Sequence, residues 1–474
     1  MDPRLRRIDE LTWEIPQEPP MRVPARVYLS ERLAVEPTAL DQLRDAACLP
    51  PAVQVLATPD IHQGYGVPIG AVVACKDAVL PAAVGYDINC GMRLLATDLD
   101  RHAINLDALA HSIARDVPLG EGHSNVPLTR SQLDDVLENG LGAIPRLAES
   151  VNHRVWEAYD ESEFGFDRAR VERSGSLPGR VEYVPDSAIS KGGQQLGTMG
   201  GGNHFIELQI VDRVFDAQLA ERFGLKAGSV TIMIHSGSRR VGYEIAGESM
   251  RRAASKHHGP KDLAWIDADD PDFDRTIGAM HAGGNFAYVN RHIMMLLVRR
   301  CLRRMVPGAR CELLYDVSHN MAQEEDHACG RVWVHRKGAT RAFGPKRMAG
   351  GPFGDIGQPV IIPGSMGTGS YLLVGSDGSE KALGSVNHGA GRTMSRTAAR
   401  GKTRHGKVLR AAAVTDEAFR RSMEGITLIA GDKQAVKEEA PAAYKDIDEV
   451  IDIVCRSGLA KRVVRLRPLA VLKG

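Results

Sequence analysis

The stretch VTIMIHSGSRR, residues 230–240, places His235 directly at the end of a short β-rich run. Further runs of this kind lie at 313–317, 332–334, 360–362 and 371–374. Histidines close the first two of them, His319 and His335. Strand ends that open into loops often display functional side chains, because a rigid scaffold then holds an accessible loop. The stretch therefore predicts a β scaffold that carries its chemistry at strand ends.

Helical periodicity appears between these runs. Residues 131–158 and 275–306 are predicted to be helices, the second with Met294, Leu297 and Cys301 at helical spacing. Strands and helices intermix without a regular βαβ rhythm, which favours an α+β fold with mixed sheets surrounded by helices.

One segment lacks periodicity altogether. Residues 159–190 are polar and contain Gly, Pro, Ser and Arg, so they are predicted to form a long surface loop or an insertion.

Composition limits the classes of protein to consider. The chain has 474 residues, 43% of them hydrophobic, with 60 Lys plus Arg against 59 Asp plus Glu. A coat-like nucleic-acid binder would carry a global basic excess. The longest apolar run, 293–298, is too short to span a bilayer, and the first residues contain no apolar signal core. Seven scattered cysteines without a CxxC pair are typical of reduced thiols. We therefore expect a cytoplasmic enzyme with no membrane partner.

Candidate metal ligands begin in VGYDINCGMRLL, residues 84–95, where Asp87 and Cys90 stand three apart. Taken alone, this pair is more typical of a buried core thiol beside a turn than of a metal site. His204 follows a glycine cluster, and His235 and His319 stand at strand ends. Nitrogen, sulfur and carboxylate donors together suit Zn or Mn, and the softness of the thiolate favours Zn.

A second group of residues is suited to phosphate. In NHGAGRTMSRTAARGK, residues 387–402, a predicted helix would carry His388, Arg392 and Arg396 along one face. A glycine-rich entry into a helix and paired guanidinium groups favour an anion site, although a solvated basic helix would have the same composition. The glycine- and serine-rich stretch PGSMGTGSY, residues 363–371, could hold a nucleotide through backbone amides.

These residue types together indicate nucleotidyl or phosphoryl transfer at a metal centre. A neutral imidazole such as that of His388 can attack an α-phosphate with loss of pyrophosphate. A metal would neutralise the charge on the transferred group. Local basic stretches in a nearly neutral chain favour contact with nucleic-acid ends over long duplexes.

The chain closely resembles the RtcB-type RNA ligases, which join RNA ends using GTP and manganese. The matching stretches run from residue 7 to the end of the sequence: RIDELTWEIP, PDIHQGYGVPIGAV, VGYDINCGMRLL, GTMGGGNHFIELQ, IHSGSRRVG, YDVSHN, VHRKGATRAF, PGSMGTGSY, NHGAGRTMSR, AYKDIDEV and RLRPLAVLKG. The resemblance implies one large α+β catalytic domain over residues 1–474. One departure is Gly369, where alanine is more usual in the family.

The resemblance implies two Mn²⁺ ions in the active site. Asp87, Cys90 and His204 would hold one, and Cys90, His235 and His319 the other, so that the thiolate bridges both. The family's use of manganese conflicts with the preference for zinc that the donor types alone suggest, and we follow the family.

The resemblance also implies that His388 is the nucleophile that accepts GMP from GTP. Residues implied to bind the nucleotide are Asn203, Glu207, Asn320, Ser365, Ser370, Arg392, Tyr444 and Lys473. Possible orienting or RNA-end contacts are Asp60, which would orient His388, and His62, Arg239, Lys337 and Arg396. The apolar stretch before Lys473 is expected to pack this lysine inward at the end of a last strand.

The implied reaction joins a 2′,3′-cyclic phosphate or 3′-phosphate RNA end to a 5′-hydroxyl end. Its partners would be GTP and RNA ends, either tRNA halves in splicing or cleaved RNA in repair, with an activating protein as a further possibility. Two rivals remain at this point. One is a dinuclear metal phosphohydrolase that only opens cyclic phosphates, and the other is an RNA-end binding module without turnover.

Overall fold

The computed structural model describes residues 2–404, 407–432 and 435–474. Two large mixed sheets form its centre. The first contains, in spatial order, β1 (Arg6–Arg7), β2 (Thr12–Ile15), β3 (Ala25–Tyr28), β4 (Ala52–His62), β5 (Ile69–Cys75), β13 (Gly330–Lys337) and β12 (Asn320–His327). The second contains β11 (Cys311–Ser318), β7 (Gly91–Asp100), β9 (Ser229–Ser236), β8 (Phe205–Val214), β21 (Ala460–Lys473), β16 (Ser370–Gly375) and β15 (Pro359–Ile362), with β20 (Thr427–Ala430) beside β21.

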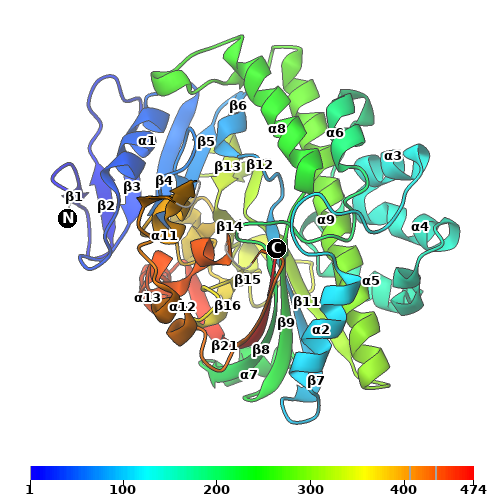
Figure 1. Ribbon diagram of the computed structural model, residues 1–474. Coiled ribbons are helices and arrows are strands. Elements are labelled where there is room, and N and C mark those ends of the chain that lie inside the picture. Colours follow the sequence, from blue (N-terminus) through cyan, green and yellow to red (C-terminus); the bar gives the residue numbers. More distant parts are fainter. Residues whose placement is uncertain (1, 405–406, 433–434) are drawn as a thin grey trace.

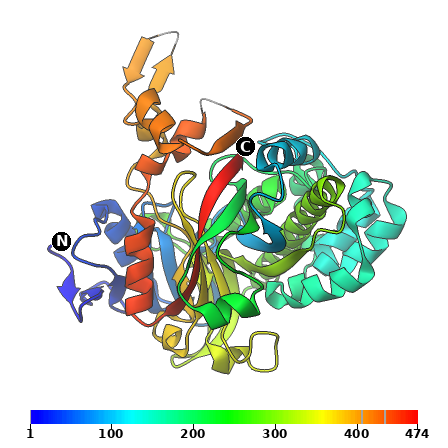
Figure 2. The same cartoon turned by 90° about the horizontal axis from the view of Figure 1, so that it is seen from below.

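Within these two sheets the neighbouring strands are antiparallel except at β3–β4 and β20–β21, which are parallel. Three small two-stranded sheets complete the β structure: β6 (Ala78–Val79) with β10 (Ile266–Asp267), β14 (Ala339–Arg341) with β17 (Ser385–Asn387), and β18 (Lys402–Arg404) with β19 (Lys407–Arg410). The β18–β19 hairpin projects from the body of the molecule (Figure 2).

The helices gather mainly on one side of the sheets (Figure 1). They are α1 (Pro37–Ala47), α2 (Leu106–Asp116), α3 (Arg130–Asn139), α4 (Ile144–Ser150), α5 (Glu161–Ala169), α6 (Asp186–Gly192), α7 (Ala217–Arg222), α8 (Arg239–Ala254), α9 (Asp272–Met305), α10 (Pro345–Met348), α11 (Arg396–Arg400), α12 (Asp416–Ser422) and α13 (Ile447–Arg456). Helices and mixed sheets together confirm the predicted α+β class.

Helix α9 is the centre of the largest hydrophobic core. It packs against β9 and against α2, α3 and α8, and most of its residues are buried. A helix that buries most of its surface in this way lies within the fold rather than on its outside. The predicted helix 275–306 is thus confirmed. Within the described residues, no helix combines the length and the apolar character that crossing a membrane requires.

The predicted continuous helix 131–158 is wrong, because the chain breaks twice there. Helix α3 ends at Asn139, and Gly140 follows with φ of 54°, which breaks the helical path. Helix α4 starts anew with Pro145 in its first turn, and a separate short turn covers Arg154–Ala158.

Residues 159–190 are also not the irregular loop that their polarity predicts. They contain α5, α6 and short 3₁₀ turns, and two of their carboxylates are buried. Asp167 forms a two-bond ion pair with Arg299 of α9, and Glu172 pairs with Arg341. The polar residues that suggested a loop are therefore the ones that attach the segment to the core.

Candidate metal centre and nucleotide cavity

Four neighbouring strands of the second sheet bring the candidate metal ligands together. Cys90 immediately precedes β7, His204 precedes β8, His235 lies near the end of β9, and His319 follows β11. The strand order β11-β7-β9-β8 and its antiparallel register set these four positions along the same sheet edge. Asp87 joins them from the turn before β7.

The ligand atoms of these residues converge in two groups. Cys90 Sγ lies 3.3 Å from His204 Nε2, which lies 2.8 Å from an oxygen of Asp87. On its other side, Cys90 Sγ lies 3.2 Å from His235 Nε2, which lies 3.3 Å from His319 Nε2. The two triplets, each with atoms within 4.8 Å of one another, share the cysteine. This is the arrangement that the family resemblance implied.

The donor set fits divalent cations. The Nδ1–H of His235 donates to the carbonyl of Asn203 at 3.0 Å, which leaves Nε2 with its lone pair toward the cluster. Burial lowers the pKa of both His235 and His319 well below the usual value, so both rings are neutral, the form in which imidazole binds a metal. Burial also raises the pKa of the Cys90 thiol, and a bound metal would reverse this shift by stabilising the thiolate.

Glycines allow the backbone to approach the ligands. A Cβ on Gly237 would lie 2.3 Å from a carboxylate oxygen of Asp87, and one on Gly200 would lie 2.2 Å from His204 Nδ1. A larger residue at either position would displace the side chain of Asp87 or of His204.

Burial raises the pKa of Asp87, but the charge and hydrogen bond of His204 outweigh burial and lower that pKa to about 2.

His388 stands next to this cluster, with its ring centroid 5.1 Å from that of His319. Its Nδ1 lies 2.6 Å from the buried carboxylate of Asp60, which also accepts the backbone N–H of His388 at 3.1 Å. Thr58 donates to the other oxygen of that carboxylate at 2.6 Å. Burial raises the pKa of Asp60, but the charge and hydrogen bond of His388 lower it overall. The pair keeps the proton on Nδ1 and leaves the lone pair of the His388 ring on Nε2.

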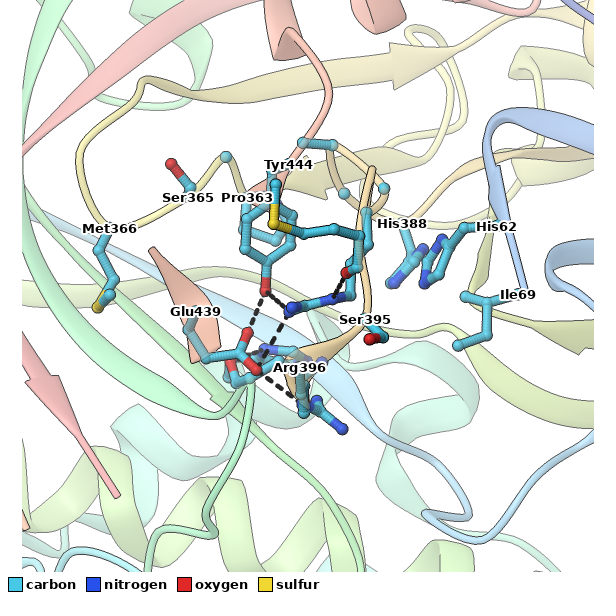
Figure 3. Close-up of a pocket in the computed structure, with 18 of the residues that line it drawn as sticks. His62, Ile69, Pro363, Ser365, Met366, His388, Ser395, Arg396, Glu439 and Tyr444 are labelled. Carbon is cyan, nitrogen blue, oxygen red and sulfur yellow. Dashed lines mark hydrogen bonds and ion pairs between the residues drawn. The ribbon is translucent and has the colours of Figure 1, made fainter. Parts of the chain in front are cut away.

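His62 lies beside His388, with ring centroids 6.5 Å apart (Figure 3). Its Nδ1–H donates to the backbone carbonyl of Asp60 at 2.9 Å. Burial lowers the pKa of His62 to about 4, so its ring is neutral and its Nε2 is a hydrogen-bond acceptor.

A cavity of about 520 Å³ opens in front of His388, a volume within the range of small-molecule sites. Residues predicted to bind nucleotide or RNA that line it are His62, Asn203, Glu207, Ser365, Arg392, Arg396, Tyr444 and Lys473. Pro363, Ser365 and Met366 come from the loop between β15 and β16 and form the wall opposite His62 (Figure 3).

The predicted helix through His388, Arg392 and Arg396 is wrong. Among them only Arg396 is helical, as the first residue of the short helix α11. Residues 391–393 instead exchange backbone hydrogen bonds with 443–445, and these tertiary bonds replace the helical ones. Gly391 has φ of 76°, and a Cβ there would lie 2.2 Å from the carbonyl of Asp60. Close backbone contact, rather than a helix N-terminus, therefore presents His388 to the cavity.

Glu439 is a cavity residue that the sequence did not reveal. It is only 3% exposed, lies 2.8 Å from Arg396 Nε and 3.4 Å from Arg392, and accepts the hydroxyl of Tyr444 (Figure 3). Burial raises the pKa of Glu439, but the charges of Lys473, Arg396 and Arg392 lower it to about 2. A single carboxylate thus holds two guanidinium groups and a phenol in place. Its sequence context contains no motif that would have identified it.

Lys473 is buried at the end of β21, as expected, with 3% of its surface exposed. Its Nζ donates to the carbonyl of Gly202 at 2.8 Å. Burial lowers the pKa of Lys473 to about 8 and raises that of nearby Glu207 to about 7. The cavity therefore contains an ammonium and a carboxyl that both titrate near neutral pH.

Two other predicted nucleotide contacts lie outside the cavity lining. Ser370 Oγ accepts the backbone N–H of Gly364 at 3.1 Å and so fixes the loop that forms one wall. Asn320 donates to the carbonyl of Asp87 at 3.1 Å and accepts the N–H of Gly338 at 2.8 Å. Both residues support the site from behind.

Arg239 and Lys337 also lie outside the cavity lining. Arg239 is buried and pairs with Glu121 at 3.2 Å. Lys337 is buried and donates to the carbonyls of Tyr65 and, at 3.0 Å, Ala82. Burial lowers the pKa of Lys337 to about 7.

The remaining histidine at a predicted strand end has no place in the site. His335 is fully buried within β13, where Nδ1 donates to the carbonyl of Val73 at 3.1 Å and Nε2 accepts the N–H of Leu80 at 2.9 Å. It is a core histidine with both nitrogens satisfied.

The side chains of 402–408, in the basic stretch after Arg396, lie outside the described residues.

Comparison with known proteins identifies relatives over the whole chain. The profile of the family described as tRNA-splicing ligase RtcB matches residues 42–474. The tRNA-splicing ligase RtcB of Nanoarchaeum equitans is 39% identical over 499 residues, with 100% of both chains covered. That of Thermococcus kodakarensis is 38% identical, with 99% of both chains covered. The RNA-splicing ligase RtcB of Mycobacterium tuberculosis is 38% identical and covers 91% of this chain and 100% of its own.

Proposed function

The chain belongs to the tRNA-splicing ligase RtcB family, and on this premise we propose that it seals RNA ends through GMP bound to His388. It is an RNA ligase, and its substrates are RNA ends. The proposed ends are a 2′,3′-cyclic phosphate or 3′-phosphate on one strand and a 5′-hydroxyl on the other. GTP enters as a reactant.

The proposed metal ligands are the two triplets that share Cys90. Asp87 and His204 complete one, and His235 and His319 complete the other. The mixed sulfur, nitrogen and oxygen donors accept either Zn²⁺ or Mn²⁺, and we propose Mn²⁺, two ions per site, from the family resemblance. When bound, the ions neutralise charge on the transferred phosphoryl group and orient its oxygens.

The first step uses His388 and Asp60. Nε2 of His388 attacks the α-phosphorus of GTP, a P–N bond forms, and the bond to the leaving pyrophosphate breaks. The ring becomes positively charged, and the Asp60 carboxylate at 2.6 Å from Nδ1 stabilises that charge. An oxygen of the RNA 3′-phosphate then attacks the phosphorus of bound GMP, and the P–N bond to His388 breaks. The 5′-hydroxyl oxygen loses its proton and attacks the RNA phosphate, and GMP leaves. A cyclic phosphate is first hydrolysed to the 3′-phosphate.

The cavity supplies the nucleotide site. Glu207 at its base is suited to accept guanine N–H groups, and the 363–369 loop provides backbone amides. Lys473, Arg392 and Arg396 are suited to bind phosphate oxygens and to stabilise the charge that develops as pyrophosphate leaves.

The observation that carries this proposal is the contact of His388 with Asp60 between the cavity and the metal ligands. A phosphohydrolase that only opens cyclic phosphates needs the metal ligands but neither an oriented nucleophilic histidine nor a nucleotide cavity, and the relatives are ligases. A role in tRNA splicing or RNA repair, a cytoplasmic location and an activating partner stay predictions.

The test is covalent labelling with α-labelled GTP and Mn²⁺, followed by denaturing electrophoresis. We expect labelled GMP to remain on the protein through an acid-labile, alkali-stable bond, as for a phosphoramidate. His388→Ala should lose the label, whereas His102→Ala, which changes an exposed histidine outside the cavity lining, should retain it. Equal labelling of the His388→Ala protein would overturn the assignment.

A further inference from the structure

We propose that Tyr65, at the mouth of the cavity, is a stacking platform for the unpaired terminal base of the RNA end being joined. This inference rests on the proposed ligase function and names the contact that would hold the RNA. Tyr65 lines the cavity and yet is 63% exposed, so it borders the reaction site and solvent at once.

The exposure of Tyr65 is unusual in this protein. Among the described residues, two tyrosines are exposed, Tyr65 and Tyr243, and both belong to one row of rings. Tyr86, immediately before the metal-ligand candidate Asp87, connects them, with its centroid 5.8 Å from Tyr65 and 4.8 Å from Tyr243. Exposed aromatic rings that gather at the mouth of a cavity are typical of a binding surface.

The two outer rings of this row are supported differently. Tyr243 stacks on Tyr86 at an interplanar angle of 21°, and the guanidinium of Arg240 lies 4.6 Å from its centroid. Both neighbours therefore already contact the Tyr243 ring. Tyr65 is tilted by 47° against Tyr86 and contacts it from one side. Tyr65 is thus the ring with the most surface to offer a ligand, and the other two rings support it.

The backbone of Tyr65 is held from below. Lys337 is buried beneath it and donates to its carbonyl and to that of Ala82. Gly85 lies next to this lysine, and its φ of 91° is a conformation that favours glycine. Lys337, which lies outside the cavity lining, is therefore a positioning residue for the platform. A ring held in advance costs less entropy when it binds its ligand.

The position of Tyr65 relative to His388 identifies the occupant. The loop of Ser365 and Met366 and the carboxylate of Glu439 lie on one side of His388, and His62 lies on the other (Figure 3). Tyr65 follows His62 by three residues and lines the same cavity, so we assign it to the side of His62. If the guanine nucleotide binds on the side of Ser365, Met366 and Glu439, the side of His62 remains free for the RNA end that receives GMP.

The ring itself, rather than the charges around it, favours a base. Arg240 shares Glu244 with Lys191, and Arg251 shares Glu248 with Arg252, so each of these carboxylates pairs with two cations. Stacking on an aromatic ring accepts any base, because every base has a π face. A ligase that joins different RNAs benefits from a contact of this kind.

The experiment titrates the protein into short single-stranded RNAs that carry 2-aminopurine as the terminal base, without GTP. One RNA ends in a 3′-phosphate and the other in a 5′-hydroxyl, which distinguishes the two possible ends. Stacking quenches the fluorescence of the base, and anisotropy reports affinity. We expect the wild-type protein to quench at least one of the two ends. Tyr65→Ala should lose this quenching and bind that RNA about tenfold more weakly, whereas Tyr65→Phe should retain both properties.

Two controls test whether the contact depends on the ring of Tyr65 and on the terminal base of the RNA. Phe166→Ala removes an exposed aromatic ring outside the cavity lining and should bind like wild type. An RNA with an abasic terminal position should bind wild type about tenfold more weakly and should no longer distinguish wild type from Tyr65→Ala. Unchanged quenching in Tyr65→Ala, or full affinity for the abasic RNA, would overturn the platform. The GMP-labelling test of the wild-type protein requires no RNA, so failure of the ligase proposal is recognised separately.

Discussion

The two ends of strand β11 carry buried polar clusters of opposite character. At its start, Arg299 and Asp167 are 2% and 1% exposed and share two hydrogen bonds of 2.6 and 2.8 Å. The Nε of the same arginine donates to the carbonyl of Cys311 at 2.8 Å. After the end of the strand, His319 joins the group of imidazole, thiol and carboxylate ligands around Cys90.

The difference between the two clusters is whether they are complete by themselves. A guanidinium and a carboxylate match each other in charge and geometry, so the first cluster needs no further group. The second consists of two triplets of potential metal ligands that share Cys90, and bound cations would satisfy their lone pairs together. Burial of polar groups therefore does not by itself distinguish a functional cluster from a structural one in this protein. The chemical type of the buried groups distinguishes them.

Replacing Cys90 is expected to have the largest effect, because its sulfur belongs to both ligand triplets. Cys90→Ser should lower metal content and slow GMP-adduct formation together, the latter by about 10³-fold if several kcal/mol of metal stabilisation are lost. His235→Ala should behave likewise. Metal analysis and single-turnover labelling measure the two quantities, with Cys48→Ser as a control at a free thiol outside the cluster. Full metal content and normal sealing in Cys90→Ser would make Cys90 a core thiol.

Breaking the ion pair between Arg299 and Asp167 should instead lower the stability of the folded protein. Asp167→Ala leaves the Arg299 guanidinium buried without its carboxylate, and we expect the free energy of unfolding to fall by about 3–5 kcal/mol. Urea unfolding measures this loss. Adduct formation per folded molecule should stay at the wild-type rate. The double variant Asp167→Leu with Arg299→Met should recover most of the stability, because it removes both charges. A loss below about 1 kcal/mol, as for exposed ion pairs, would contradict this role.

Lys473 already has a hydrogen-bond partner in the protein, and its replacement tests whether it also takes part in the reaction. Although its Nζ already donates to Gly202, we propose that the ammonium stabilises charge on the nucleotide. Lys473→Ala should slow adduct formation at saturating GTP by about 10²-fold, with metal content and folding retained. Lys461→Ala, an exposed lysine at the other end of β21, is the matched control. Equal rates in the Lys473→Ala and wild-type proteins would limit Lys473 to packing.

The smallest effect concerns pH. Burial lowers the pKa of Lys473 to about 8, so in the free protein its charge is present below pH 8 and is lost above it. The affinity for GTP should therefore fall by up to about tenfold per pH unit above pH 8. Lys473→Arg keeps its charge over this range and should show a flatter profile. GTP titrations between pH 7 and 9.5 make the comparison, and identical profiles for both proteins would assign the titration to another group.

Much of the fold followed from periodicity, and the exceptions have local causes. The helical spacing of Met294, Leu297 and Cys301 predicted helix α9, and only the structure shows that most of its residues, polar ones included, are buried. Residues 131–158 have a helical pattern, but Gly140 and Pro145 interrupt it. The 159–190 segment appeared to be a loop, because a polar residue that pairs in the core, such as Asp167, cannot be told from a solvated one without its partner.

The sequence by itself determined the chemical types of the site. The thiol, imidazole and carboxylate groups stand in recognisable stretches, and His388 stands in another, residues 387–402. The chemical type of a side chain and its neighbours in the chain can be read directly from the sequence. The family resemblance implied which groups meet, and only the tertiary structure shows how the chain brings them together. The antiparallel register of four strands brings Cys90 between His204 and His235, and backbone bonding to 443–445 replaces the helix expected after His388. Glu439 and Tyr65 acquire their importance from neighbours distant in the chain, because contacts of this kind depend on where strands and loops pack.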